Sequence, residues 1–217
     1  MGGVRPVMRY GPTVAQSATT KRMTAEAFLS WEQSQSERHA YFHGEIFAMA
    51  GGSPRHSRLA SRMIARLDTA LVGSPCAVHT SDLRLGLDAE HFVYADAVVV
   101  CGPLELRPGT TDVVVNPRVV VEVLSRRTEA YDRGEKQAAY LALRSVDHYV
   151  LVSQRDPRVE VYSRENDGTF RYRVYRTGDE IALDRISVQL AVDDLYASVF
   201  ELPGDDGPGE GSGPATP

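Results

Sequence analysis

Two strand-like segments of this chain each carry one carboxylate among apolar residues, and this feature constrains the fold most strongly. Asp96 lies within FVYADAVVVC, and Glu122 lies within VVVEVL. An ionised carboxylate that is buried in such a strand without a partner costs several kcal/mol. We therefore expect both segments to be core strands, and we expect each carboxylate to be balanced by a shifted pKa, a cation or a metal ion.

The alternation of side chains along a strand relates the two carboxylates to each other. Asp96 shares one strand face with Val98, and Glu122 shares one with Val120. If the two strands are neighbours in register, both carboxylates point toward one ion. Magnesium or manganese suits a site of hard oxygen ligands that also keeps bound water. The sequence therefore predicts a Mg²⁺ or Mn²⁺ site at Asp96 and Glu122.

Lys136 is the third candidate, because it lies on a helical apolar stripe with Ala139, Tyr140 and Leu143. A lysine on a core-facing stripe needs an acidic partner, and its helix follows the Glu122 strand closely. Beside two metal-bound carboxylates, its ammonium can orient water and stabilise charge on phosphorus. The alternatives are a solvated lysine or a surface ion pair, and for Tyr140 an accessory contact or a purely core position.

Three further polar residues have both a functional and a structural interpretation, and His56 has a structural one. Asp82, in TSDLRL, is a third carboxylate for the metal or a turn former. Arg126 and Arg127 contact phosphate or lie on the surface. His56 caps or hydrogen-bonds locally, and the histidine spacing does not fit a zinc site.

Capping residues and periodicity predict helices that alternate with strands. Thr24 opens a helix over 24–35, and Ser53-Pro54 opens one that runs to about residue 73. HAYFHGEIFAMA predicts two short strands about a turn at His43-Gly44. A third helix over 132–144 is expected, with Asp132 as its cap and Glu135 completing the capping pair. Further strands are expected at CAVHT, LRLGL, FVYADAVVVC, RVVVEVLS, HYVLVS, RVEVYSR and FRYRVYR. This order predicts an α/β (α+β) fold, a mixed sheet flanked by helices.

The length of 217 residues allows one good hydrophobic core. We expect a single domain over 23–202. Residues 1–22 lack periodicity, and residues 203–217 are too poor in apolar side chains to offset the entropy of ordering. We therefore expect a disordered N-terminal extension over 1–22 and a disordered C-terminal tail over 203–217.

Charge and cysteine content narrow the classes of function. The net charge of -5 leaves no global positive field, so any nucleic-acid binding requires a local basic patch. Cys76 and Cys101 are too few for a disulfide framework, and we expect free thiols in an intracellular protein. No apolar run approaches the ~20 residues that span a membrane. The expected location is the cytoplasm, without a membrane partner.

Several segments, taken in order, resemble the Uma-type restriction endonuclease family of the PD-(D/E)XK nuclease superfamily. The resemblance covers about residues 23–200 and rests on MTAEAFLSWE, GEIFAMAGGSPRHSRLA, SDLRL, YADAVVVCGP, VVVEVLS, AYDRGEKQAAY and HYVLVSQRDPRVEVYSR. It implies a restriction-endonuclease-like core and divalent-metal-dependent cleavage of DNA phosphodiesters. It makes Asp96 the first motif acid and Glu122 the second. The superfamily lysine two residues later is replaced here by Leu124, and Lys136 takes its place from the next helix.

This chain departs from the family pattern at two positions. Ala95 stands where relatives usually have proline, and Ala40 stands where they commonly have glutamate, with Glu45 the nearest remaining acid. The leading hypothesis is a DNA endonuclease. The alternative is a catalytically inactive nuclease fold that binds nucleic acid or protein, and a third is phosphodiester chemistry on RNA or a small nucleotide. A homodimer paired through the FRYRVYR strand would suit duplex cleavage.

Overall fold

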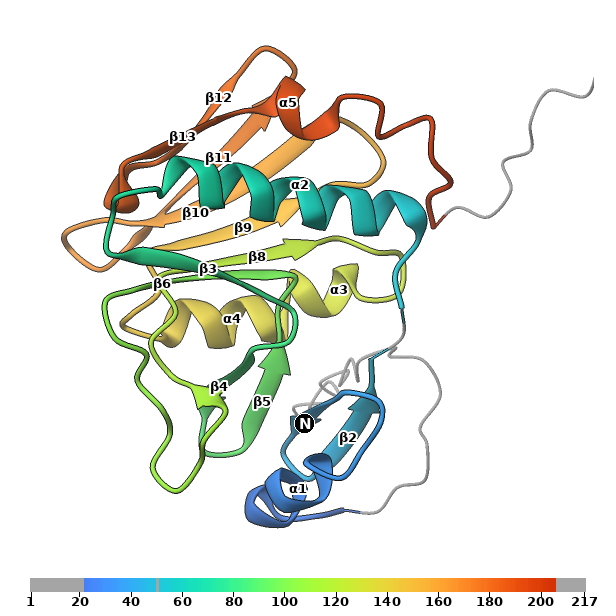
Figure 1. Cartoon of the computed structure of the whole chain (residues 1–217), viewed down its shortest axis with the longest axis vertical. Coiled ribbons are helices and arrows are strands. Elements are labelled where there is room, and N and C mark those ends of the chain that lie inside the picture. Colours follow the sequence, from blue (N-terminus) through green and yellow to red (C-terminus); the bar gives the residue numbers. More distant parts are fainter. Residues whose placement is uncertain (1–21, 50, 206–217) are drawn as a thin grey trace, which may run out of the picture.

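A six-stranded mixed sheet with helices on both faces forms the centre of the molecule (Figure 1). The computed structural model of the chain describes residues 22–49 and 51–205. Across the sheet the strands run β11 (Phe170–Arg176), β10 (Arg158–Arg164), β9 (His148–Val152), β8 (Val119–Val123), β6 (Ala97–Cys101) and β3 (Cys76–Thr80). Within this sheet β8 and β9 are parallel, and its other neighbouring pairs are antiparallel. This arrangement confirms the predicted fold class.

Side-chain alternation along β8 divides the core into two layers. Val119 and Val121 pack in the layer that holds α2 (Pro54–Ala70), the hairpin β12 (Glu180–Leu183) to β13 (Val188–Ala191), and α5 (Val192–Tyr196). A short 3-10 helix, η1 (Asp184–Ile186), joins β12 to β13. Val120 packs in the opposite layer with Tyr140 of α4 (Glu135–Ala142). Residues of even number on β8, Glu122 among them, therefore face α4.

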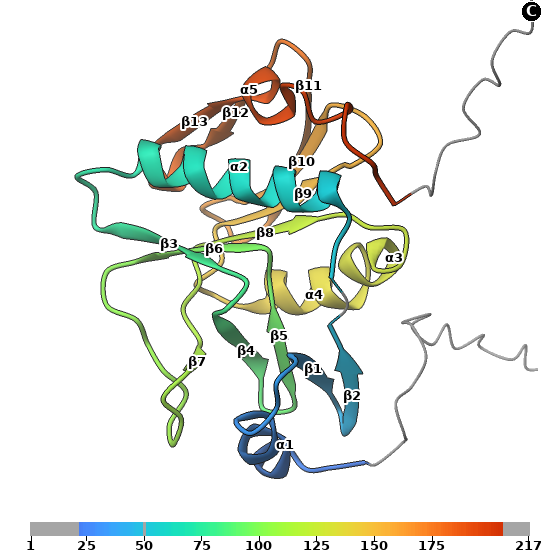
Figure 2. The same cartoon turned by 45° about the vertical axis from the view of Figure 1, so that its right-hand side comes forward.

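A smaller sheet lies on the far side of α4 (Figure 2). Its strand order is β2 (Glu45–Ala48), β1 (His39–Phe42), β5 (His91–Tyr94), β4 (Arg84–Asp88) and β7 (Val113–Val114). Helix α1 (Ala25–Glu32) covers it, and the Phe28 ring stacks on Tyr41 with 4.9 Å between centroids. Helix α4 and the short helix α3 (Glu129–Asp132) lie between the two sheets.

The expected long strand FVYADAVVVC is two strands. The chain leaves the small sheet at the end of β5 and enters the large sheet at β6, and Ala95 and Asp96 form the junction. Asp96 lies outside both strands, and a side-chain contact holds it against β8: its Oδ2 accepts a hydrogen bond from the backbone N–H of Val123 at 2.7 Å. The break therefore places the carboxylate where the two sheets diverge.

The first two helices and the first turn confirm the sequence predictions, whereas the third helix does not. Thr24 Oγ1 accepts from the Ala27 N–H at 3.2 Å, and Ser53 Oγ accepts from the His56 N–H at 3.1 Å. His43 and Gly44 have φ values of 46° and 93°, as the tight turn requires.

The predicted helix over 132–144 is split. Gly134, with φ -111° and ψ -107°, separates α3 from α4, so Asp132 ends one helix and does not cap the next. The side chain of Asp132 is buried, with its Oδ1 3.5 Å from Lys136 Nζ, and is therefore not available as a cap.

The prediction of two free thiols is wrong, because Cys76 and Cys101 form a disulfide. The cysteines lie directly opposite each other in the register of β3 and β6. Strand pairing alone brings the two side chains together, and neither residue signals this within its own segment.

The predicted C-terminal tail begins at residue 203, and the structure describes its first three residues, 203–205. The Arg55 N–H donates to the Pro203 carbonyl at 3.1 Å, and Gln154 Nε2 donates to Asp205 Oδ2 at 3.0 Å. The fold thus includes residues 203–205. The expectations for residues 1–21 and 206–217 lie outside the described residues. Over 22–49 and 51–205, no helix is both long and apolar enough to cross a membrane.

Candidate active site

A pocket of about 180 Å³ receives residues from both sheets and from the α3–α4 region. Asp96 comes from the β5–β6 junction, Glu122 from β8 and Lys136 from the first turn of α4, and all three line the pocket. These are the three residues that the sequence singled out, and Asp96 and Lys136 lie 40 residues apart along the chain. Their convergence depends on strand order and on the packing of α4 below the sheet (Figure 2).

The two motif acids face each other across neighbouring strands. Ala97 of β6 pairs with Val121 of β8, so continuing the antiparallel register by one residue sets Asp96 opposite Glu122. The sequence-based condition that these strands be neighbours is therefore confirmed. The Asp96 side chain is 20% exposed, whereas that of Glu122 is 6% exposed. Asp96 thus faces the open part of the pocket, and Glu122 lies at its base.

Glu122 is held by two donors from α4. Its Oε1 lies 2.6 Å from Lys136 Nζ and accepts a hydrogen bond from the Tyr140 hydroxyl at 3.0 Å. Burial raises the pKa of Glu122 above its usual range, although the ammonium of Lys136 opposes the rise. Tyr140 is fully buried in the core layer and does not line the pocket, and its hydroxyl contacts the carboxylate of Glu122.

Lys136 is enclosed by acceptors. Besides Glu122, its ammonium lies 3.5 Å from Asp132 Oδ1 and donates to the Tyr94 carbonyl at 3.4 Å. Burial lowers the pKa of Lys136, but the two carboxylates outweigh it and hold the pKa above its usual range. Lys136 is therefore a cation, suited to stabilise negative charge in the pocket rather than to accept a proton.

Asp132 and His56 belong to the site, and the sequence analysis assigned neither of them to it. The i,i+4 spacing of Asp132 and Lys136 was the available signal for the first. His56 Nε2 lies 3.3 Å from Asp96 Oδ2. Burial lowers the pKa of His56, but the hydrogen bond and charge of Asp96 raise it overall. No local pattern distinguishes His56 from an ordinary residue in the first turn of α2.

Other candidates lie outside the pocket. Asp82 forms an ion pair with Arg38 and accepts from Thr80 Oγ1 at 3.1 Å. Glu45 is exposed on β2 and does not line the pocket. Neither acid is placed to join Asp96 and Glu122.

The two arginines after β8 have different positions. Arg127 is exposed and lines the pocket. Arg126 lines an adjacent smaller pocket, and its backbone N–H donates to Asp205 Oδ2 at 3.3 Å. Arg127 is thus the arginine better placed to contact a phosphate in the pocket.

The donor set fits a divalent ion that keeps most of its water. Asp96 Oδ1 and Glu122 Oε2 receive no hydrogen bond from the described residues, since the contacts go to the other oxygen of each carboxylate. Magnesium is commonly bound by one or two carboxylates plus waters. Within 22–49 and 51–205, no three His, Cys, Asp or Glu residues gather as a closed metal cage. The site can therefore supply two hard oxygen ligands.

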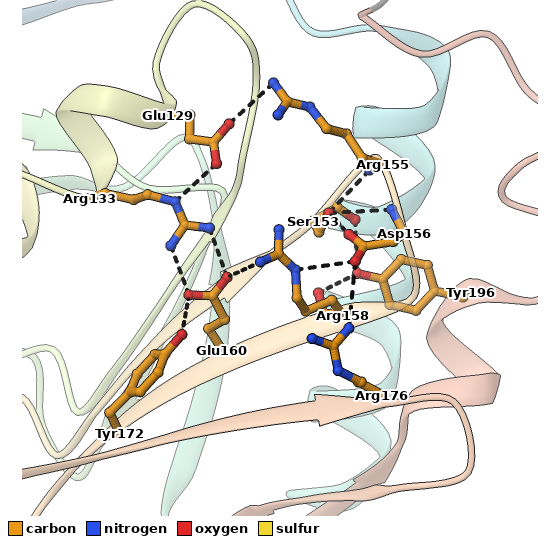
Figure 3. Close-up of polar contacts among 10 residues, drawn as sticks. All are labelled: Glu129, Arg133, Ser153, Arg155, Asp156, Arg158, Glu160, Tyr172, Arg176 and Tyr196. Carbon is orange, nitrogen blue, oxygen red and sulfur yellow. Dashed lines mark hydrogen bonds and ion pairs between the residues drawn. The ribbon is translucent and has the colours of Figure 1, made fainter.

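A charge network around the buried Glu160 fixes the α3–α4 connection, which precedes Lys136 (Figure 3). Glu160 of β10 is 2% exposed and accepts two hydrogen bonds from Arg133, both at 2.7 Å. Its carboxylate also accepts from the Tyr172 hydroxyl at 2.7 Å and lies 3.2 Å from Arg158. Because Arg133 lies between α3 and α4, this bidentate contact anchors the start of α4 to the sheet.

Comparison with known proteins agrees with this arrangement. The model of the Uma2 family, described as "Putative restriction endonuclease", matches residues 25–193. An uncharacterised protein of Synechocystis sp. (strain ATCC 27184 / PCC 6803 / Kazusa) is 35% identical over 181 residues, which cover 83% of this chain and 94% of that protein. A second uncharacterised protein of the same strain is 30% identical over 151 residues, covering 69% and 85% of the two chains.

A solved structure shares the fold. The crystal structure described as "a putative nuclease belonging to DUF820" from Anabaena variabilis ATCC 29413 superposes with a TM-score of 0.67. The match covers 82% of this chain and 99% of that chain, at 14% sequence identity. At that identity the likeness concerns the fold.

Proposed function

This chain belongs to the Uma2 family, and from that premise we propose that it is a divalent-metal-dependent endonuclease that hydrolyses phosphodiester bonds of DNA. One observation carries the proposal: Asp96, Glu122 and Lys136 converge in a single pocket. Two facing carboxylates with free oxygens, next to a buried ammonium, suit an ion and a phosphate together.

In this mechanism Asp96 and Glu122 would hold Mg²⁺ or Mn²⁺. The chemistry that such an ion would supply is polarisation of the phosphate and a lower pKa of bound water. Tyr140 holds Glu122 in position through its hydroxyl. Lys136 supplies a fixed positive charge against the negative charge that develops on phosphorus.

Substrate binding depends on local charge, because the net charge of the chain is -5. Arg127 at the pocket and Arg126 beside it are the nearest candidates for contacts to flanking phosphates. Since such contacts release counterions, we expect affinity for DNA to fall steeply with salt.

The decisive experiment is cleavage of plasmid and single-stranded DNA with Mg²⁺, with Mn²⁺ and with EDTA. Asp96→Asn, Glu122→Gln and Lys136→Met are each expected to reduce the rate at least 100-fold. The first two variants lose a proposed metal ligand, and the third loses the positive charge beside the phosphate. Asp82→Asn is the matched control, since Asp82 is a carboxylate outside the pocket. Cleavage that survives in well-folded Asp96→Asn and Glu122→Gln contradicts the proposal.

A catalytically inactive binding module is the second candidate. Ala40 lines the pocket, so the glutamate common in relatives at this position is absent from the site itself. This candidate predicts DNA binding without cleavage by the wild type. Gain of cleavage in Ala40→Glu would then identify the missing acid as the cause.

We further propose a homodimer, because β11 is an unpaired edge of the six-stranded sheet in the described part of the chain. Light scattering on the purified protein tests this directly. A monomer at micromolar concentration would contradict it.

A further inference from the structure

One wall of the pocket is apolar, in contrast to the charged wall formed by Asp96, Glu122 and Lys136. It consists of residues from the β1–β2 hairpin and the segment after it: Ala40, Phe42, Phe47, Ala48 and Met49. Met49 is 39% exposed, and Phe42 and Phe47 are partly exposed. Within the described residues, none of these three side chains belongs to a core cluster. The Phe42 ring lies edge-on against His43 and His91, with 4.4 and 4.7 Å between centroids, whereas Phe47 and Met49 face the pocket without a core cluster of their own.

Strand register explains why these side chains face the pocket. On the paired strands β1 and β2, Tyr41 lies opposite Ile46, and both pack in the cluster that contains α1. Ala40 lies opposite Phe47, one position along, so this pair faces the other side of the hairpin. The small sheet thus uses one face for its own core and gives the other to the pocket.

Two more aromatic rings complete this part of the cavity. Tyr94 and Tyr131 line it, and the Tyr131 hydroxyl is hydrogen-bonded to His91 Nε2 at 2.8 Å, which restrains the ring. The cavity volume of about 180 Å³ is slightly larger than the ~150 Å³ cavity that holds one benzene ring. The pocket as a whole, charged wall included, therefore has room for one flat heterocycle.

An unpaired nucleobase is the occupant that this chemistry favours. In a duplex the faces of the bases are covered by stacking, so an apolar aromatic wall finds no partner there. An unpaired base exposes its faces and stacks on aromatic side chains. The negative net charge of the chain also disfavours a long duplex held by phosphate contacts alone.

We propose that the Phe42–Phe47–Met49 wall binds one unpaired nucleobase adjacent to the phosphate at Asp96 and Glu122. The substrate class is then single-stranded or locally unpaired nucleic acid, and not intact duplex. This inference rests on the proposed function for the identity of the neighbouring phosphate site, and it concerns binding and not the chemical step.

The test measures binding separately from cutting. Fluorescence anisotropy in EDTA measures the affinity for a single-stranded oligonucleotide and for the blunt duplex. It also measures the affinity for a series of single strands, each with one abasic site at a different position. Stacking is worth about 1–3 kcal/mol per base, so Phe47→Ala should weaken single-strand binding about tenfold and duplex binding little. At the position bound by the wall, the abasic strand should bind the wild type about tenfold more weakly. Phe47→Ala should not distinguish the two strands.

Met49→Ala is a second test of the wall, and Leu104→Ala is its matched control. Leu104 is 45% exposed, comparable with the 39% of Met49, but it does not line the pocket. We expect weaker single-strand binding in Met49→Ala and no change in Leu104→Ala. Phe47→Leu, which removes the ring but keeps an apolar side chain, replaces Phe47→Ala if the alanine variant does not fold. Parallel DNA and RNA strands identify the preferred sugar.

The outcomes separate this inference from the proposed function. Equal binding of the complete strand and every abasic strand by the wild type overturns the inference, as does an equal loss in Leu104→Ala. Cleavage by a wild type whose binding is the same for the complete strand and every abasic strand leaves the nuclease proposal standing and refutes the base site. Base-dependent binding without any cleavage refutes the nuclease proposal and supports the base site.

Discussion

Replacing Lys136 by methionine tests whether the charged wall is a buried ion-pair system. The lysine is 7% exposed and is the ammonium that faces Glu122 at 2.6 Å and Asp132 at 3.5 Å. The side chains of Glu122 and Asp132 are 6% and 3% exposed, so removing the ammonium leaves both carboxylates without their cation in a region of low dielectric. Methionine keeps the apolar stem and the approximate volume, which limits the effect of a cavity.

Breaking a buried pair on one side costs about 3–5 kcal/mol, and we expect a loss of about 3 kcal/mol at pH 7.5. The loss should depend on pH, because the bare carboxylates can take up a proton in the folded state. Their unfolded pKa values are near 4, so the folded variant then holds a proton that the unfolded chain has released. Stability accordingly falls as pH rises, by up to about 1.4 kcal/mol per pH unit for one extra proton.

Urea unfolding in EDTA at pH 5.5 and pH 7.5 measures this effect without metal. We expect Lys136→Met to lose less than about 1 kcal/mol at pH 5.5 and about 3 kcal/mol at pH 7.5. Adding Glu122→Gln should recover at least half of the loss, because the amide still accepts from Tyr140 and carries no charge. Arg127→Met, at an exposed cation of the same pocket, should change stability by about 0.5 kcal/mol or less. A loss that is absent, or that does not vary with pH, refutes the reasoning.

Two further predictions concern stability away from the pocket. Burial lowers the pKa of His148 to about 4 from its usual 6.5, and its Nε2 accepts the Arg185 N–H at 3.2 Å. As the pH falls, the unfolded histidine takes up its proton at a higher pH than the folded one. The free energy of unfolding therefore keeps its full value above pH 6.5 and falls toward pH 4, with a loss of about 2 kcal/mol at pH 5. His148→Gln should flatten this acid limb in urea unfolding, and an unchanged slope contradicts the assignment. Reducing the disulfide between Cys76 and Cys101, separated by 25 residues, should cost about 3 kcal/mol. Dithiothreitol should lower the urea midpoint of the wild type but not of Cys76→Ala/Cys101→Ala. A wild-type midpoint that is the same with and without dithiothreitol contradicts the bond.

Much of the local structure follows from short stretches of sequence. Thr24 and Ser53 cap the first two helices as predicted, and Gly44 forms the expected turn. Strand alternation correctly placed Val98 and Val120 in one core layer. These features depend on backbone conformation and on neighbours within a few residues, so their causes are visible in the sequence.

The errors arise where distant segments meet. Asp132 has the sequence context of a helix cap, but the packing of α4 makes it a partner of Lys136. Cys76 and Cys101 look like isolated apolar thiols until β3 pairs with β6. Asp205 lies in a segment of low hydrophobicity, yet Gln154 binds it to the fold.

The sequence by itself determined the fold class, the family and the three residues on which the proposed chemistry depends. Isolated charges in apolar segments are costly, so Asp96, Glu122 and Lys136 stand out from their neighbours without any structure. Only the tertiary structure decided what surrounds them. His56 and the apolar wall at Phe47 enter the pocket because of the strand order and the orientation of the β1–β2 hairpin. Those are properties of non-local pairing, which no single segment encodes.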